Sequence, residues 1–365
     1  MDWQSILRLA RNIGASDVHF STGETPWLRL DGCMLRLQAL NAQASPHILT
    51  AEDLTHILSA LQGSCQLQLT AFHHLDFAIT LPELGRFRVN AFQQARGPSL
   101  VLRLIPNDLP TLDSLQAPAC LRSWATQASG LILVTGPTGC GKSTLLAALL
   151  QHINTQQTSH ILTLEDPIEC VHAPVQCLIQ QRELGRDTPD FESGLRAALR
   201  EDPDVILIGE LRDATTIRLA LTAAETGHLV LSTLHTASAP QAIDRLVDAF
   251  PSGEKEGVRT LFADCLVGIL AQTLCPHASG TGRVAAHEVM VATSAVRNLV
   301  REGKVGQLYS QLQTGQSVGM QTLDQSLLKL FRQKKISLAT LQEFSKYPQN
   351  LNLMDNLQTE RVPLS

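Results

Sequence analysis

The nine residues from Gly136 to Thr144 carry the clearest chemical signal in the chain. They read Gly136-Pro137-Thr138-Gly139-Cys140-Gly141-Lys142-Ser143-Thr144, which fits the phosphate-loop pattern G-x-x-x-x-G-K-[ST]. Backbone N–H groups of such a loop, together with the positive end of the following helix, bind nucleotide phosphates. Lys142 would reach the β- and γ-phosphates, Ser143 would contact the accompanying Mg2+, and Thr144 would support the helix start. The pattern predicts nucleoside-triphosphate binding; the alternative is a chance glycine-rich turn.

Carboxylates follow an apolar run at residues 161–164. Glu165, Asp166 and Glu169 come at its end, interrupted by a proline. Hydrolysis of a triphosphate needs a carboxylate that orients or deprotonates water while Mg2+ and a lysine balance the phosphate charge. All three acids qualify by type, and an exposed acidic turn is the equally weighted alternative.

A further acid follows the apolar run Val205 to Ile208. It is Glu210, which stands one residue beyond a glycine. An acid at this point commonly contacts Mg2+ directly or through water. Because a glutamate is longer than the usual aspartate, Glu210 could also reach the attacking water. It is therefore a rival to Glu169 as general base.

Two histidines, His228 and His235, flank the apolar run 229–234. A neutral imidazole donates from one nitrogen and accepts at the other, so either could sense the γ-phosphate or stabilise the carboxylates. A single histidine is more often structural, but two in this context favour a function. They are too far apart along an extended strand to bind one metal ion.

Arginines of the first hundred residues are further candidates. In Arg86 to Phe92, apolar and polar residues alternate, so Arg88 faces away from the apolar side; Arg96 and Arg103 lie nearby in sequence. An arginine from the same or a neighbouring subunit can stabilise charge on a γ-phosphate. A solvated basic face is the alternative for each of them.

Composition limits the class of protein. A chain of 365 residues with 44% hydrophobic residues suits two globular domains, and a net charge of -5 disfavours nucleic acid as a partner. No apolar stretch is long enough for a transmembrane segment and the N-terminus is no signal peptide, which predicts a cytoplasmic protein. The eight cysteines form no C-x-x-C, so free thiols are expected. Cys140 is expected to line the nucleotide path, where alkylation would block entry.

The elements that must position these residues fall into two parts. Residues 1–110 show short strands, including a hairpin signal at Trp27 to Gly32, and a helix that begins at the Thr50/Asp53 capping box; the boundary is placed in the proline-rich segment 105–110. Beyond it, strand-like runs at 131–135, 161–164, 205–208 and 229–234 alternate with helical patterns, which predicts an α/β fold with a mainly parallel sheet. Residues from about 285 to 350 are expected to be mostly helical, and 351–365 a loose tail.

These segments, in this order, resemble the secretion ATPases, and within them the PilT-like motors that retract type IV pili. Gly136 to Thr144 resembles the Walker A motif, 161–169 the Asp box, 204–210 an atypical Walker B and 226–236 the His box; Ala15 to Phe20 matches the opening signature. The octapeptide 295–302 is similar to the AIRNLIRE motif of the retraction branch, and 319–324 to the segment that follows it. Extension and type II secretion motors carry a tetracysteine insertion after the His box, which this chain lacks.

The resemblance implies a PAS-like α+β domain ahead of a RecA-like P-loop domain with C-terminal helices. It implies a homo-hexamer that binds ATP and Mg2+ between domains, hydrolyses ATP and passes force to an inner-membrane pilus platform protein, with twitching motility as the result. The matching functional residues are Lys142, Glu169, Glu210, His228 and His235, with Arg88, Arg96 and Arg103 closing on the nucleotide.

Three residues depart from the family pattern. Cys140 replaces a serine, Cys170 a phenylalanine, and His287 stands where phenylalanine is common. None removes a catalytic group, so an accessory retraction paralogue or another secretion or conjugation ATPase stays open. A nucleic-acid translocase and a regulatory module that binds ATP without doing work are remoter alternatives.

Overall fold

The computed structural model describes residues 2–30, 32–40, 47–62, 73–105 and 109–347. Their contacts divide the chain into two compact units. The first consists of residues 1–109 together with 165–172, and the second of 110–164 and 173–365. A short acidic segment from the middle of the sequence thus groups with the N-terminal part.

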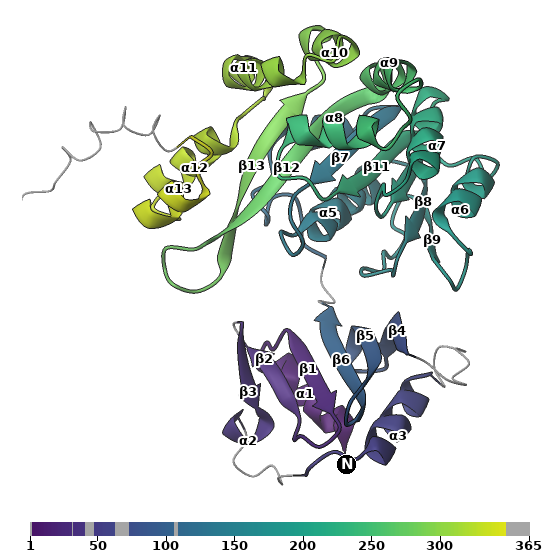
Figure 1. The fold of residues 1–365 in the computed structure, drawn as a ribbon, viewed down its shortest axis with the longest axis vertical. Helices are drawn as coiled ribbons and strands as arrows, with labels where there is room; N and C mark the ends of the chain where they lie inside the picture. Colours follow the sequence, from purple (N-terminus) through teal and green to yellow (C-terminus); the bar gives the residue numbers. More distant parts are fainter. Residues whose placement is uncertain (1, 31, 41–46, 63–72, 106–108, 348–365) are drawn as a thin grey trace, which may run out of the picture. The chain divides into compact units, whose positions relative to one another are not determined.

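The first unit is built on a six-stranded antiparallel sheet with the order β3-β2-β1-β6-β5-β4 (Figure 1). The hairpin predicted around Gly32 is confirmed, because Trp27 pairs with Arg36 and Leu30 with Cys33. The strands are β1 (Asp17–Ser21), β2 (Trp27–Leu30), β3 (Cys33–Arg36), β4 (His74–Leu81), β5 (Gly85–Gln94) and β6 (Gly97–Ile105).

Helices α1 (Trp3–Asn12) and α3 (Ala51–Gln62) bury their apolar sides in the core of this sheet, and α2 (Leu37–Leu40) follows β3. The predicted capping box is present at α3. The Asp53 N–H donates to Thr50 Oγ1 (3.1 Å), and Asp53 Oδ2 accepts from the Thr50 N–H (2.9 Å). These bonds satisfy donors that the first turn of a helix leaves unpaired.

The second unit has a seven-stranded sheet with the order β13-β12-β7-β11-β10-β8-β9. Strands β12, β7, β11, β10 and β8 run parallel, and β13 is antiparallel to β12. The four predicted strands are all present. The strands are β7 (Gly130–Thr135), β8 (His160–Glu165), β9 (Leu178–Glu183), β10 (Val205–Ile208), β11 (Leu229–Leu234), β12 (Leu266–Pro276) and β13 (Arg283–Val291).

Helices cover both faces of this sheet. Alternate residues of a strand point to opposite faces, and they enter two separate cores here. Leu131 and Leu133 of β7 pack into one core with α6 to α11, whereas Ile132 and Val134 pack into the other with α4 and α5. The strands therefore read as continuous apolar runs, as buried parallel strands do. The helices are α4 (Cys120–Ala125), α5 (Lys142–Gln156), α6 (Phe191–Ala198), α7 (Ala214–Glu225), α8 (Ala239–Asp248), α9 (Lys255–Cys265), α10 (Ser294–Arg301) and α11 (Leu308–Thr314), with 3-10 turns η1 (Val305–Gln307) and η2 (Gly315–Val318).

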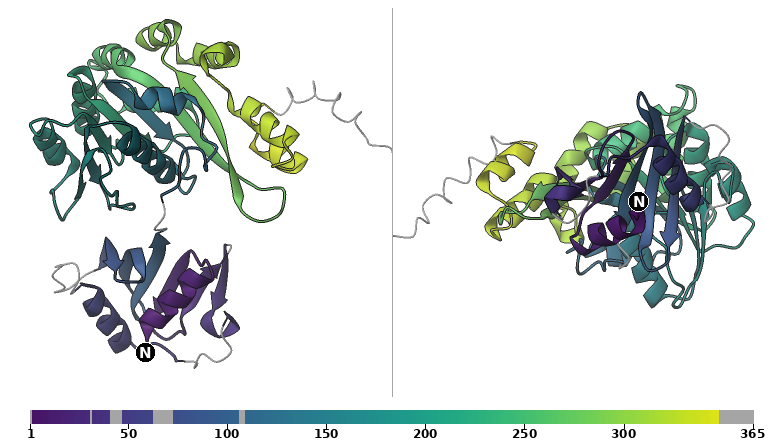
Figure 2. Two further views of the ribbon diagram at one scale, coloured as in Figure 1. Left: turned by 180° about the vertical axis from the view of Figure 1, so that it is seen from behind. Right: turned by 90° about the horizontal axis from the view of Figure 1, so that it is seen from below.

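The C-terminal part differs from expectation in one respect. Residues 285–291 belong to β13, so the helical part begins only with α10. Helices α12 (Leu323–Arg332) and α13 (Leu338–Phe344) pack on β12 and β13 through a small apolar core (Figures 1 and 2). The long strand pair explains the miss, since its alternating small and apolar residues carry no strong period. The predicted tail at 351–365 and linker residues 106–108 lie outside the described residues.

Among the helices that the structure describes, none combines the length and apolar character needed to cross a bilayer.

Candidate functional site

The phosphate-loop sequence lies at the carboxyl end of β7, the middle strand of the parallel sheet, and leads directly into α5. Its glycines are required by the geometry. Gly141 has φ +89°, a left-handed conformation that disfavours other residues, and a Cβ on Gly136 would lie 2.4 Å from the carbonyl oxygen of Gln272. The loop is thus bent tightly against the neighbouring strand β12.

Lys142 is buried at the amino end of α5. Its Nζ donates to the carbonyl oxygens of Gly136 (2.8 Å) and Pro137 (3.1 Å), which holds the ammonium group against the loop. Ser143 and Thr144, which follow in the first turn of the helix, are exposed. A cation and two hydroxyl groups therefore lie together at a helix N-terminus, where anions are favoured.

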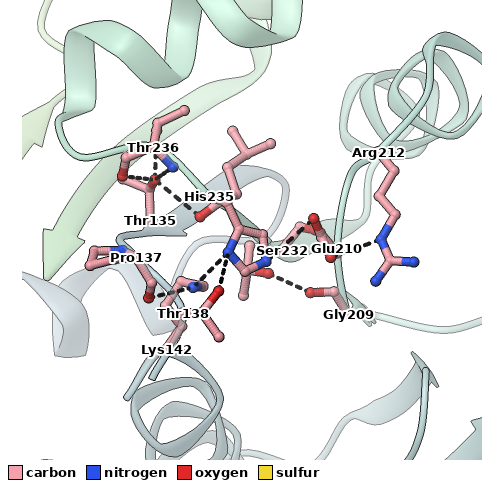
Figure 3. A network of polar contacts seen from close by, with 12 residues as sticks. Thr135, Pro137, Thr138, Lys142, Gly209, Glu210, Arg212, Ser232, His235 and Thr236 are labelled. Atoms are coloured by element: carbon pink, nitrogen blue, oxygen red, sulfur yellow. Dashed lines mark hydrogen bonds and ion pairs between the residues drawn. The ribbon is translucent and has the colours of Figure 1, made fainter. Parts of the chain in front are cut away.

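His235 lies between Lys142 and Glu210 (Figure 3). Its Nδ1 is 3.4 Å from Lys142 Nζ and 3.5 Å from Thr138 Oγ1, and its Nε2 is 3.4 Å from Glu210 Oε1. An ammonium group only donates, so Nδ1 accepts and Nε2 carries the proton toward the carboxylate. The imidazole thereby joins the phosphate loop to the acid that follows β10.

Register explains why these residues meet. Strand β11 pairs with β7 so that Leu234 lies beside Thr135, and β10 pairs with β11 so that Ile208 lies beside Ser232. His235, the phosphate loop and Glu210 consequently leave the sheet at the same edge. Ligands of open parallel sheets bind at this edge.

Glu210 is held in place from two directions (Figure 3). The Thr233 hydroxyl donates to the Gly209 carbonyl (2.6 Å), which fixes the backbone just before the acid. Arg212 Nε donates to Glu210 Oε2 (2.8 Å) on the side away from His235. Both carboxylate oxygens of Glu210 are therefore engaged, one by Arg212 and one by His235.

His228 does not join this group. It stands at the amino end of β11, where its carbonyl accepts from the Gly130 N–H and its Nδ1 is 2.9 Å from the Ala223 carbonyl oxygen. The six residues of β11 separate it from His235, a span of about 20 Å. The structure therefore brings His235 but not His228 to the phosphate loop, since β11 carries His228 to the opposite edge of the sheet; a functional role for His228 stays a prediction.

Glu165 and Glu169 group with the first unit. Glu165 ends β8 and is half-buried. Glu169 Oε1 accepts from Arg88 (3.3 Å), and Arg88 also forms a two-bond pair with Asp76 across β4 and β5. This pairing, chiefly the hydrogen bonds to Asp76, raises the pKa of Arg88. Of the two rival glutamates, Glu210 is the one that contacts the Lys142–His235 pair.

The three candidate arginines do not form one cluster. Arg88 and Arg103 are direct partners on β5 and β6, and Arg103 donates to Asp17 (2.8 Å). Arg96 lies in the turn that joins these strands and pairs with Glu24. Six residues of β5 from Arg88 to that turn amount to about 20 Å. The structure therefore places Arg96 apart from Arg88 and Arg103, and a role for any of the three at the nucleotide stays a prediction.

Cys140 also differs from expectation. Its side chain is buried, with 3% exposed, and a Cβ on Gly136 would lie 2.5 Å from its Sγ. Burial raises the pKa of the thiol, which lowers the thiolate fraction. The thiol therefore packs beneath the loop rather than lining a nucleotide path, and the residue can contribute to phosphate binding through its backbone.

Three further polar residues near these sites were not among the predicted site residues. Arg212 holds Glu210, Arg86 donates twice to the Ile168 carbonyl (3.0 and 2.7 Å), and Arg283 at the start of β13 donates to the Gly139 carbonyl (3.5 Å). Arg212 could have been found as a basic residue two positions beyond the acid. Contacts of Arg86 and Arg283 span 82 and 144 residues, and no local pattern reports them.

A phosphate loop at the carboxyl edge of a parallel sheet, with a lysine, an imidazole and a carboxylate joined beside it, defines a P-loop nucleoside triphosphatase. Residues 4–342 match the family described as Type II/IV secretion system protein, and the chain belongs to this family. It is an ATPase of the secretion type, as the resemblance implied.

Two relatives and one solved structure specify the branch. The chain is 47% identical to the type IV pilus retraction ATPase PilT of Pseudomonas aeruginosa, over 96% of this chain and the full length of that protein. It is 37% identical to the type IV pilus ATPase PilU of the same organism, over 99% of this chain and 93% of that protein. The crystal structure of the pilus retraction motor PilT with bound ADP superposes with a TM-score of 0.85 at 39% identity, covering 97% of this chain and all of that one.

Proposed function

We propose that this protein hydrolyses ATP to power the retraction of type IV pili. The difference in identity supports the retraction motor over the accessory paralogue, since PilT is 47% identical and PilU 37%. The contact chain Lys142–His235–Glu210 supports hydrolysis rather than binding alone, because it joins a phosphate-binding group to a carboxylate.

In this proposal Lys142 and the loop N–H groups bind the β- and γ-phosphates. Glu210 orients the attacking water and accepts its proton, and His235 relays the presence of the γ-phosphate between Lys142 and Glu210. Arg212 keeps the Glu210 carboxylate in place. Glu165 and Glu169 are further candidates for the hydrolytic step, and Arg88 sets the position of Glu169.

The residues present suit Mg2+ as the companion of ATP. Ser143 offers an exposed hydroxyl beside Lys142 and Glu210 offers a carboxylate, and Mg2+ prefers such oxygen ligands. The described part of the chain has no group of three or more His, Cys, Asp or Glu side chains that would hold an ion alone. A nucleotide-dependent ion fits this arrangement, with Ser143 as a direct ligand and Glu210 as a ligand through water; it would neutralise phosphate charge during hydrolysis.

The motor is proposed to act as a homo-hexamer in the cytoplasm, at the inner-membrane base of the pilus. Arg88 and Arg103, adjacent on β5 and β6, are the candidates to supply positive charge to a nucleotide in this assembly. The partner that receives the force would be the pilus platform protein in the inner membrane.

Steady-state hydrolysis of ATP by the wild type and by Lys142→Ala, Glu210→Gln and Glu169→Gln tests the site. We expect the first two variants to lose turnover by more than about 100-fold, because each removes a charge or a base that the transition state needs. Glu169→Gln should retain more activity than Glu210→Gln. The opposite order would assign the base to Glu169.

Deletion of the gene tests the biological role. Surplus surface pili without retraction would support the retraction motor, whereas loss of pili would identify an assembly motor. A deletion strain in which retraction is weakened but not lost would indicate the accessory paralogue. Stimulation of the ATPase by DNA or RNA would instead identify a nucleic-acid translocase and contradict the proposal.

A further inference from the structure

A buried side chain, Gln272 of β12, lies directly beneath the phosphate loop. Strand β12 runs parallel to β7 with Ala271 beside Thr135, and it continues past the point where β7 ends. Gln272 therefore stands level with Gly136. It is only 6% exposed, in a strand whose preceding residues are apolar.

Both the nitrogen and the oxygen of the Gln272 side-chain amide form hydrogen bonds. Its Nε2 donates to the carbonyl of Cys140 (2.5 Å), and its Oε1 accepts from His287 Nε2 (3.0 Å). The direction follows from chemistry, because Nε2 of an amide only donates and its oxygen only accepts. His287 must then carry its proton on Nε2. Burial lowers the pKa of His287 to about 4, so the ring is neutral at physiological pH.

His287 is itself fixed by its backbone. Its N–H donates to Ser326 Oγ of α12 (3.0 Å), and its carbonyl accepts from Gln321 Nε2 (2.8 Å). The ring therefore has a defined position from which to hold Gln272. A buried network of hydrogen bonds of this kind restricts the orientation of its members.

The bond to Cys140 has a consequence for the loop. A trans peptide is planar, with its C=O and its N–H pointing in opposite directions. Gln272 draws the Cys140 carbonyl to the underside of the loop, so the N–H of Gly141, in the same peptide, points to the other side. Gly139 and Gly141 have φ values of +78° and +89°, which bend successive N–H groups toward a common point, as in an anion-binding nest.

We infer that Gln272 is a positioning residue for nucleotide binding, which aims the Gly141 N–H at a phosphate, and that His287 acts through it. Close packing supports this role, since a Cβ on Gly141 would lie 2.9 Å from Gln272 Nε2. The small residue at 141 and the amide at 272 are thus complementary. The inference rests on the proposal that this loop is the nucleotide site.

The test is the dissociation constant of a fluorescent ADP with Mg2+, titrated into the full chain. Gln272→Met, of similar size but with no donor, should weaken binding about tenfold, the effect of one misdirected hydrogen bond to a charged group. His287→Phe should weaken it several-fold. His287→Gln, which can donate from a similar position, should bind close to the wild type.

The double variant Gln272→Met/His287→Phe distinguishes a relay from two separate effects. Because His287 acts through Gln272, the double variant should bind no more weakly than Gln272→Met alone. Thr273→Ala, one residue further along β12 and half-buried, is the matched control and should not change the affinity. Thermal unfolding without nucleotide shows whether each variant is folded.

Several outcomes would overturn the inference. These are an unchanged affinity in Gln272→Met, additive losses in the double variant, or equal affinities for His287→Phe and His287→Gln. The last comparison stands even where Gln272→Met fails to fold. Lys142→Ala keeps the two proposals apart: undiminished ADP binding there would refute the site itself, whereas lost binding there with normal binding in Gln272→Met would refute only the role of Gln272.

Discussion

Replacing Arg297 by alanine should lower the stability of the second unit substantially. Arg297 belongs to the octapeptide 295–302, which resembles a motif of the retraction branch, but its contacts indicate a structural role. Arg297 is the fourth residue of α10, and its guanidinium reaches the end of α9. It donates to the carbonyls of Ala263 and Asp264, and its Nε donates to that of Ala292 (3.1 Å). The last carbonyls of a helix have no partner within it, and a cation there is favoured by the helix dipole.

The size of the effect follows from these three bonds. Those to Ala263 and Ala292 are partly buried, and that to Asp264 is exposed. A hydrogen bond from a charged donor contributes about 1.5 kcal/mol when partly buried, and an exposed one contributes little. Arg297→Ala should therefore lower the free energy of unfolding by about 2–3 kcal/mol. In a domain of this size that corresponds to a fall in Tm of roughly 5–10 °C.

Urea unfolding of the nucleotide-free protein, followed by circular dichroism, measures this change. The control is Arg301→Ala, one turn further along α10, which removes an exposed ion pair with Asp264 and should cost less than about 1 kcal/mol. Arg297→Lys should fall between the two, since one ammonium cannot replace the planar fork. A loss below about 0.5 kcal/mol in Arg297→Ala would refute the argument, because water would then serve these carbonyls equally well.

Three other outcomes are expected. Cys140 should react with iodoacetamide far more slowly than the exposed Cys33, with or without nucleotide, because it is buried and burial raises the pKa of its thiol; equal rates by mass spectrometry would contradict its placement. Since burial lowers the pKa of His287 from 6.5 to about 4, the folded protein binds fewer protons than the unfolded chain between these values, so stability falls as pH drops; His287→Gln should remove about 2 kcal/mol of the loss between pH 7 and pH 5 in urea titrations. Arg96→Ala should keep nearly full ATPase activity whereas Arg88→Ala loses most of it, and equal losses would contradict the separation of these residues in the sheet.

The sequence was informative where local pattern and topology agree. Apolar runs that alternate with helical patterns predicted the parallel sheet, and residues directly after those runs had to meet at one edge. Lys142, Glu210 and His235 could be placed together on that ground alone. The same reasoning, applied to distance along a strand, places His228 at the opposite edge of the sheet, because the six residues of β11 lie between it and His235.

Side-chain partners across the chain were beyond the reach of local pattern. Arg96 looked equivalent to Arg88 because both lie near each other in sequence, yet the hairpin turn separates them by most of a strand. Cys140 looked accessible because phosphate loops bind ligands, but which side of the loop its side chain occupies depends on β12 packing below it. In both cases proximity in sequence does not determine how the residues lie in space.

For Gln272 the sequence indicates that a partner exists but not which residue it is. A polar residue inside an apolar strand signals that a buried partner exists, because an unpaired buried amide is costly. The partner is Cys140, 132 residues away, and finding it requires the register of β12 against β7. His287, a departure from the family pattern, supplies the second bond from 15 residues away on β13. A substitution that seems to leave the catalytic groups untouched can thus act on the phosphate loop, since the loop depends on the strand beneath it for the direction of its N–H groups.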